Sequence, residues 1–285
     1  MHFYLHLKLR TTYTLFQNAP SAVQLLNMNE KDKKPDPLSE KAKEFQVHRN
    51  PKKPTKNIPE AYAEHTHKHV QDFIDKELHE RAGRAEEELI RGFHAIREYP
   101  KSVTFFGSAR FEENHPYYQR ARELSRRICE MGYAVITGGG PGIMEAGNRG
   151  SKEVCGYSVG FNIELPNEQV INPYVSHGVD FHYFFTRKVS LAFSAEVYLF
   201  FPGGFGTLDE FFEILTLMQT KKIPPVPVIC IGSEFWDPLN SFICKTQLGS
   251  FGTISASDAN LYKVMDGDEY ILKVIQEAKL RNEYL

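Results

Sequence analysis

The sequence has few cysteines, no long apolar run and almost no net charge. Its 285 residues include only four cysteines, with no CxxC pair, so the sequence indicates neither a disulfide framework nor a zinc site. No stretch approaches the roughly 20 apolar residues that a membrane-spanning helix needs. The 34 basic and 36 acidic side chains give a net charge of -2, which excludes a global basic field for nucleic acid. We therefore predict a protein of a reducing compartment, the cytoplasm, that binds neither nucleic acid nor membranes.

What is present is ordinary for a globular protein, because 41% of the residues are hydrophobic and 25% are charged. The first 27 residues, however, contain Lys8 and Arg10 but no carboxylate, and the first acidic residue is Glu30. Such a segment is either an organelle transit peptide or an upstream extension with Met28 as the true first residue. We favour the extension, because Met28 opens directly into a polar segment, and we expect residues 1–27 to contribute nothing to folding or catalysis.

The next segment also lacks a core of its own. Residues 28–60 hold 15 charged side chains and five prolines, too little apolar surface to offset the entropy of ordering. We therefore predict a disordered or dispensable N-terminal tail over residues 1–59. Apolar residues at helical spacing on both sides of Gly83 then predict a helical extension of one or two amphipathic helices over residues 60–99.

Four histidines lie in this extension: His65, His67, His69 and His79. A metal site is one interpretation and a solvated helix face is the other. We favour the solvated face, because no carboxylate or cysteine completes a ligand set at sensible spacing.

Residues 100–285 alternate apolar strands with helices. Strands are expected at 103–107, 133–137, 156–164, 179–184, 197–201 and 226–231. Helices are expected at 116–131, 143–151 and 186–194, from the second glycine loop to 219, and at 268–280. Almost wholly apolar strands between helices indicate a parallel sheet covered on both faces. We predict a doubly wound, Rossmann-like α/β domain that binds its ligand at the carboxyl ends of the strands.

Three polar or glycine-rich turns follow predicted strands, at residues 107–110, 137–142 and 202–207. A glycine loop between strand and helix can cradle a phosphate, because the backbone approaches closely and the helix start offers free N–H groups. Two such loops, TGGGPG and PGGFGT, are better evidence than one, although neither has the GxGxxG or the GxxxxGK[ST] form. The candidate substrate-binding residues in these turns are Gly107, Ser108, Gly138, Gly139, Gly140, Gly203, Gly204, Gly206 and Thr207.

Two pairs of side chains near the loops each have two interpretations. Thr207 and Glu210 form T-x-x-E, which is a capping box at a helix start; alternatively, Glu210 orients water or a ribose hydroxyl beside a phosphate loop. Arg187 and Lys188 are either a solvated surface pair or a functional pair. They lie in the first turn of a predicted helix, where positive charge opposes the helix dipole, and sequences tend to break such local rules at functional sites.

The stretch PGGFGTLDE at 202–210, preceded by FFTRK at 184–188, resembles the signature of the LONELY GUY family. These are phosphoribohydrolases that were long mislabelled as lysine decarboxylases. FFGSAR, TGGGPGIMEAGNRG, LPNEQVINPY and LTLMQTKKI are similar to further blocks of the family's larger bacterial branch, in the family's order, over about residues 100–275. The decarboxylase label has no support here, because no lysine is placed as a Schiff-base residue beside a pyridoxal-phosphate site.

The resemblance implies hydrolysis of the N-glycosidic bond of a nucleoside 5′-monophosphate, giving a free base and ribose 5-phosphate. It implies a homodimer or larger assembly and no metal or organic cofactor. By the resemblance, Arg187 and Glu210 are the catalytic pair. Lys188 and the loop 203–207 bind the nucleotide, and Glu168 and Thr216 line the site. We expect a purine nucleotide, AMP or a cytokinin-type nucleotide, and the sequence leaves the base open.

Two other function classes share the fold. One is a non-catalytic nucleotide or molybdenum-cofactor carrier, and the presence of both Arg187 and Glu210 argues against it. The other is an interaction protein like the DNA-processing factors, against which the balanced charge and the lack of a basic-aromatic stripe argue. The chemistry favours the hydrolase, because cleavage of a ribosyl bond builds positive charge that a carboxylate can stabilise.

Overall fold

Seven short strands, almost all of them apolar, pair in parallel in the computed structural model, which describes residues 60–165 and 171–280. The strands are β1 Ser102–Phe106, β2 Ala134–Thr137, β3 Ser158–Ile163, β4 His177–Phe181, β5 Val197–Phe200, β6 Val228–Cys230 and β7 Lys263–Val264. Their order is β4-β3-β2-β1-β5-β6-β7, and every pairing is parallel. The predicted doubly wound parallel sheet is confirmed. The predicted tail over residues 1–59 lies outside the described residues.

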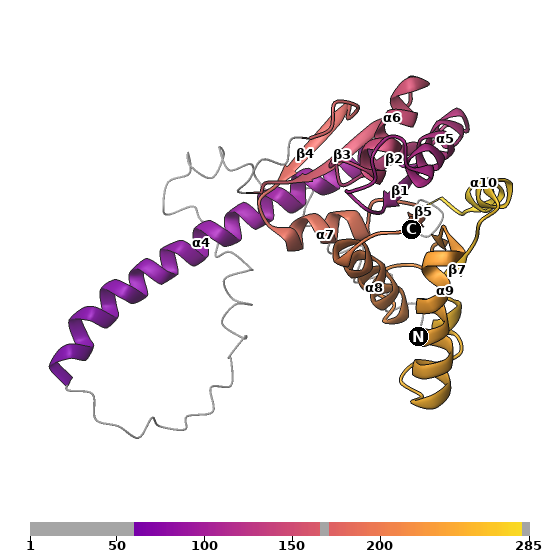
Figure 1. The fold of residues 1–285 in the computed structure, drawn as a ribbon. Helices are drawn as coiled ribbons and strands as arrows, with labels where there is room; N and C mark the ends of the chain where they lie inside the picture. Colours follow the sequence, from indigo (N-terminus) through magenta and orange to yellow (C-terminus); the bar gives the residue numbers. More distant parts are fainter. Residues whose placement is uncertain (1–59, 166–170, 281–285) are drawn as a thin grey trace, which may run out of the picture. The chain divides into compact units, whose positions relative to one another are not determined.

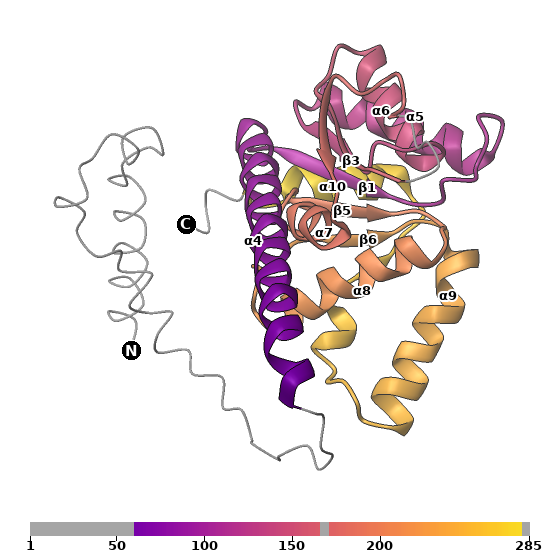
Figure 2. The same cartoon turned by 90° about the vertical axis from the view of Figure 1, so that its left-hand side faces the viewer.

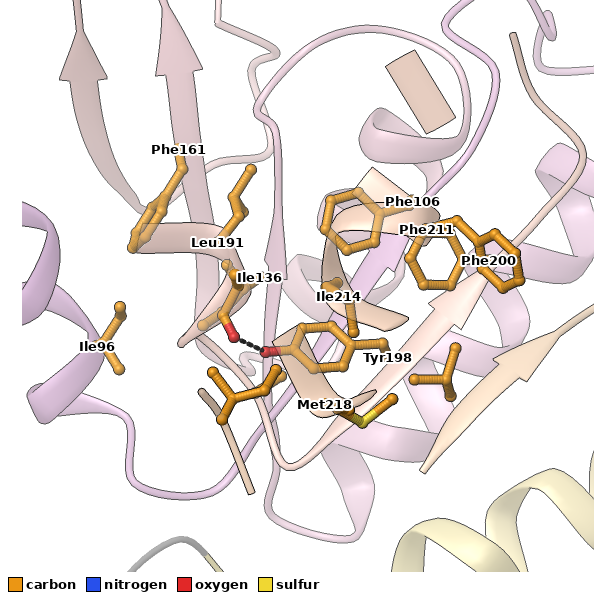
Figure 3. Close-up of a cluster of buried hydrophobic side chains, with 14 of the residues drawn as sticks. Ile96, Phe106, Ile136, Phe161, Leu191, Tyr198, Phe200, Phe211, Ile214 and Met218 are labelled. Carbon is orange, nitrogen blue, oxygen red and sulfur yellow. Dashed lines mark hydrogen bonds between the residues drawn. The ribbon is translucent and has the colours of Figure 1, made fainter. Parts of the chain in front are cut away.

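Helices cover both faces of this sheet, as Figures 1 and 2 show. The helices are α4 Glu60–Glu98, α5 Pro116–Glu130, α6 Ile143–Glu153, α7 Phe184–Ala192, α8 Phe205–Gln219, α9 Ser233–Ser241 and α10 Asp268–Glu277. Side chains of α5, α6 and α10 share one buried apolar cluster, whereas α4, α7 and α8 contribute to a second. Figure 3 shows part of the second cluster, in which Phe106, Phe200 and Phe211 pack together. Burial of apolar side chains on both faces explains why the central strands read as continuous hydrophobic runs.

Several predicted boundaries differ from the structure. The predicted strand at 179–184 is β4, which begins two residues earlier and ends at Phe181, and α7 begins at Phe184. The apolar letters run on from the strand into the helix, so hydrophobicity alone did not mark the boundary. In addition, β4 is an edge strand and buries only alternate residues at its end.

Other elements left no clear pattern in the sequence. α4 is one continuous helix through Gly83, because a single interior glycine costs only about 1 kcal/mol. The strand β7 was missed, since two residues are too few to show a period. α9 and the π-helix Phe242–Ser250 that follows it were not predicted either, and Pro238 inside α9 argues against a helix on sequence grounds.

The strand order places the candidate site. From β1 the chain proceeds through β2 and β3 to β4 on one side, and then returns to β5 on the other side of β1. Neighbouring strands that lead to opposite sides leave a crevice at their carboxyl ends. The turns at residues 107–110 and 202–207 follow β1 and β5 directly, so both meet at this crevice.

One buried hydrogen bond ties β5 to the end of α7. The hydroxyl of Tyr198 donates to the carbonyl oxygen of Ala192 at 2.6 Å, the dashed line in Figure 3. We expect Tyr198→Phe to lower the free energy of unfolding by about 1–2 kcal/mol, because it removes a donor from a buried carbonyl. Urea unfolding measures this change. Tyr270→Phe is the control and should stay within about 0.5 kcal/mol, because Tyr270 is 71% exposed. Equal losses in the two variants would contradict the assignment.

Candidate active site

A cavity of about 840 Å³ lies at the carboxyl ends of β1 and β5. Its lining comes from the turn after β1, from the starts of α6, α7 and α8, and from α9. The volume falls in the range of small-molecule sites, and the position is the one that a doubly wound sheet favours for ligands.

Most of the sequence-predicted site residues meet in this cavity. Those that line it are Gly107, Ser108, Gly138, Arg187, Lys188, Gly203, Gly204, Gly206, Thr207 and Glu210. Gly139 and Gly140 do not line it; their carbonyl oxygens both accept from the buried amide of Asn172 at 3.0 Å. Thr216 is exposed on α8, with its hydroxyl bonded to the carbonyl of Phe212, and it also lies outside the lining. Glu168 lies outside the described residues.

The start of α8 corrects one interpretation of Thr207 and Glu210. The N-cap of α8 is Gly204, and the first helical hydrogen bond runs from Leu208 N to Gly204 O at 3.1 Å. Thr207 is therefore the third residue of the helix rather than its cap, so the capping-box interpretation is wrong. The glycines of PGGFGT let the helix begin three residues earlier than the T-x-x-E pattern indicates.

Two segments outside α7 position Arg187. Its Nε donates to the carbonyl oxygen of Phe161 on β3 at 2.6 Å, and its side chain is only 13% exposed. Gly138, after β2, leaves the space for the guanidinium, since a Cβ at that position would overlap Arg187 Nη2. Burial lowers the pKa of Arg187, an effect that the nearby charge of Glu210 opposes.

Glu210 is a buried carboxylate that is incompletely paired. Its Oε1 lies 3.9 Å from Arg187 Nη1, and no donor among the described residues bonds Oε2. Burial raises the pKa of Glu210 to about 7, and the charge of Arg187 opposes this rise. A carboxyl group that lines a cavity and titrates near neutrality has the properties of an acid, a base or a charge stabiliser.

Lys188 lies in a different environment from its neighbour Arg187. Its Nζ lies 2.8 Å from Asp209 Oδ2 and 3.3 Å from Glu213 Oε2. Burial lowers the pKa of Lys188, but the hydrogen bond to Asp209 and the surrounding carboxylate charges outweigh it, so the net pKa is raised. A Schiff-base lysine needs a lowered pKa, so Lys188 fits a fixed cation better than a nucleophile.

Several residues that line the cavity were not among the sequence-predicted site residues: Arg110, Met144, Phe184, Phe205 and Phe235. Arg110 is exposed, directly after β1, and its place in FFGSAR was an available signal. Phe205 is 95% exposed at the start of α8, and a large apolar side chain in full solvent at a loop tip is a further signal for ligand contact.

Over residues 60–165 and 171–280, no group of three or more His, Cys, Asp or Glu side chains is arranged to hold a metal ion. His79 is exposed on α4, with its Nδ1 2.6 Å from the carbonyl of Asp75. None of the helices in the described ranges is both long and apolar enough to span a membrane.

Part of the chain is similar in sequence to known proteins. The family model described as "Possible lysine decarboxylase" matches residues 144–275. The cytokinin riboside 5′-monophosphate phosphoribohydrolase of Rhodococcoides fascians is 29% identical over 163 residues, 55% of this chain and 81% of that protein. The protein of that name, LOG, from Oryza sativa subsp. japonica is 33% identical over 137 residues, 45% of this chain. The match spans 53% of the rice protein, about half its length.

The structure is also similar to a solved protein structure. The molybdenum cofactor carrier protein of Chlamydomonas reinhardtii shares 22% identity, covers 62% of this chain and 97% of its own, and has a TM-score of 0.45.

Fold and site together define a Rossmann-like α/β protein with a ligand cavity at its topological switch point. The sequence matches are more specific, and the resemblance seen in the motifs is confirmed. Over about half of its length the chain is similar to proteins named cytokinin riboside 5′-monophosphate phosphoribohydrolases, as the resemblance to the LONELY GUY family implies.

The buried Glu210 should make stability depend on pH. Because burial raises its folded-state pKa from 4.5 to about 7, its contribution is fully present below about pH 4.5 and is lost as pH rises through 7. Relative to Glu210→Gln, we expect the free energy of unfolding of the wild type to fall by about 3 kcal/mol between pH 4.5 and 7.5, at about 1.4 kcal/mol per pKa unit. Urea unfolding of both proteins across this range measures the difference. A difference that stays constant with pH would contradict the raised pKa.

Proposed function

We propose that the protein hydrolyses the N-glycosidic bond of a purine nucleoside 5′-monophosphate, AMP or a cytokinin-type nucleotide, to the free base and ribose 5-phosphate. The observation that carries this proposal is the buried carboxylate of Glu210, which lines a cavity, has an oxygen without a donor among the described residues, and lies beside Arg187. The names of the relatives, phosphoribohydrolases of cytokinin riboside 5′-monophosphates, support the same reaction class.

The 5′-phosphate has a natural position at the start of α8. The loop 203–207 leads into this 15-residue helix, and the N-cap Gly204 offers no side chain that would occupy the first-turn N–H groups. These N–H groups carry partial positive charge and favour an anion. Arg110 and Lys188 also line the cavity and add positive charge. Binding energy from the phosphate can then assist the reaction at the ribose.

The reaction itself can proceed beside Glu210. Cleavage of the bond between ribose C1′ and the base develops positive charge on the sugar, and the Glu210 carboxylate can stabilise that charge. The base leaves with the electron pair of that bond and takes up one proton, while water adds at C1′ and loses one, so the products are the free base and ribose 5-phosphate. With a pKa of about 7, Glu210 is matched to accept that proton near neutral pH. Arg187 can pair with ribose or phosphate oxygens.

The aromatic side chains at the cavity support a planar base. Phe184 and Phe205 line the cavity and are both exposed, and their ring faces offer stacking surfaces for a purine. A carrier protein of the same fold would bind a nucleotide without cleaving it. A carrier has no need of a buried, half-paired carboxylate, whose desolvation lowers stability. The homodimer, the cytoplasmic location and the absence of a cofactor stay predictions.

The phosphate anchor leads to the first test. Purified protein is incubated with AMP or with adenosine, and release of adenine is followed by chromatography. We expect AMP to be cleaved at least about a hundredfold faster in kcat/KM, because adenosine lacks the group that binds at the start of α8. Equal rates would remove the phosphate anchor, and no adenine from any nucleotide of a purine panel would remove the proposed reaction.

Substitution of the carboxylate is the second test. We expect Glu210→Gln to lower kcat for AMP by about a hundredfold or more, because it removes the charge that stabilises the sugar cation. Glutamine has nearly the same volume, and Glu210 caps no helix, so folding should persist. Glu277→Gln is the matched control, since Glu277 is a largely exposed glutamate on α10, and it should keep wild-type turnover. Undiminished turnover in Glu210→Gln would exclude Glu210 as the catalytic carboxylate.

A further inference from the structure

A second buried glutamate reaches the site helix from outside the matched family segment. Glu88 lies on α4, far before residue 144 where the family match begins, and its side chain is 1% exposed. Its Oε1 accepts from the backbone N–H of His182 at 3.0 Å. Its Oε2 accepts from the N–H of Tyr183 at 3.2 Å and lies 2.5 Å from the hydroxyl of Thr186. All three partners lie at the start of α7.

α7 has no such group of its own. Its N-cap residue, Tyr183, makes no side-chain cap hydrogen bond, and no acidic residue lies in its first turn. Arg187 and Lys188 instead put two positive charges near the positive end of the helix dipole, which is unfavourable. The carboxylate of Glu88 supplies the missing acceptor and the missing negative charge from another helix.

α4 also packs closely against α7 just beyond Glu88. A Cβ at Gly92 would overlap Ser190 Oγ of α7, so a glycine is needed for the approach of the two helices. The next residue, Phe93, packs edge-on against Phe193 with ring centroids 5.9 Å apart. Figures 1 and 2 both show α4 running beside α7. The contact from Glu88 is thus part of a packed interface.

The same short helix determines where Arg187 points. Arg187 follows Thr186 directly, and its own N–H bonds to the carbonyl of Tyr183 at 3.3 Å in the turn that Glu88 caps. Its guanidinium must reach both the Phe161 carbonyl and the space above Gly138. A shift of this turn by a fraction of an ångström would misplace the guanidinium relative to Glu210.

From these contacts we propose that Glu88 is a positioning residue: it caps α7 and thereby holds Arg187 in register with Glu210 across the cavity. This proposal deepens the proposed function and rests on it. It also assigns a role to α4, because the helix outside the matched segment completes the site helix. Glu88 itself does not line the cavity, so it acts through Arg187.

A double-mutant cycle on the full chain tests the proposal. We expect Glu88→Gln to lower kcat for AMP about ten- to a hundredfold, in the range typical of a misplaced catalytic group. In an Arg187→Lys background the same change should lower kcat by less than about threefold, because the group that Glu88 positions is already lost. Glu87→Gln is the matched control, an exposed neighbour on α4, and should keep wild-type turnover.

The outcomes separate positioning from general stability. Losses that multiply in the double variant, or a folded Glu88→Gln protein with the turnover of Glu87→Gln, would overturn the proposal. Circular dichroism at the assay temperature checks folding, and Glu88→Asp, which keeps the charge but shortens the reach, enters the same cycle if Glu88→Gln does not fold.

The cycle also distinguishes this proposal from the proposed reaction. If the wild type binds AMP without cleaving it, the proposed hydrolysis is wrong. The double-mutant cycle is then measured as dissociation constants for AMP, and we expect the effects of the two substitutions on binding to be non-additive in the same way. A wild type that neither binds nor cleaves AMP overturns both.

Discussion

The structure around the cavity depends on one costly arrangement, the burial of Glu210 with no cation close enough for a tight hydrogen-bonded pair. Arg187 Nη1 lies 3.9 Å from Glu210 Oε1, too far for a tight hydrogen-bonded pair, and Oε2 has no donor among the described residues. Desolvation of a carboxylate without full pairing lowers stability, and that cost appears as the raised pKa of Glu210. Such a group persists only if the rest of the fold holds it in place.

The sheet and its two covering layers provide that support. β1 and β5 are neighbours from which the chain leads to opposite sides, so the turns that follow them open toward each other. α8 carries Glu210 and packs through Phe211 and Ile214 into the apolar cluster of Figure 3, and α7 contributes Leu191 to the same cluster. The two helices are therefore anchored by apolar burial on one side while their charged residues face the cavity. Gly138 and the carbonyl of Phe161 then define the direction of Arg187.

α7 connects two buried glutamates with different environments. Glu210 faces a cavity, and its Oε2 has no donor among the described residues, whereas Glu88 is enclosed by two backbone N–H groups and a hydroxyl. A saturated carboxylate at a helix start stabilises the helix, and an unsaturated one beside a cavity is available for chemistry. The difference lies in the number of donors that surround each group, because both residues are the same amino acid at nearly the same depth.

Much of the fold could be predicted because it follows from local patterns. The apolar runs at β1, β2 and β5, the glycine loops after β2 and β5, and Pro116 at the start of α5 each left a signal that needs no distant partner. β7 escaped prediction because it is only two residues long and exists only because β6 offers an edge. T-x-x-E at Thr207 and Glu210 fits a capping box as well as a functional carboxylate, and only the position of the N-cap at Gly204 distinguishes the two.

The sequence by itself determined the parallel α/β architecture, the family resemblance and the residue types that gather at the strand ends, because periodicity and contiguous motifs carry this information. Only the tertiary structure decided which of those residues share a cavity. It left Gly139, Gly140 and Thr216 outside the lining and brought Arg110 and Phe184 in. It also decided that Glu88, 99 positions before Arg187, belongs to the support of the site. Hydrogen bonding and desolvation depend on distances between segments far apart in the chain, and no local pattern records those distances.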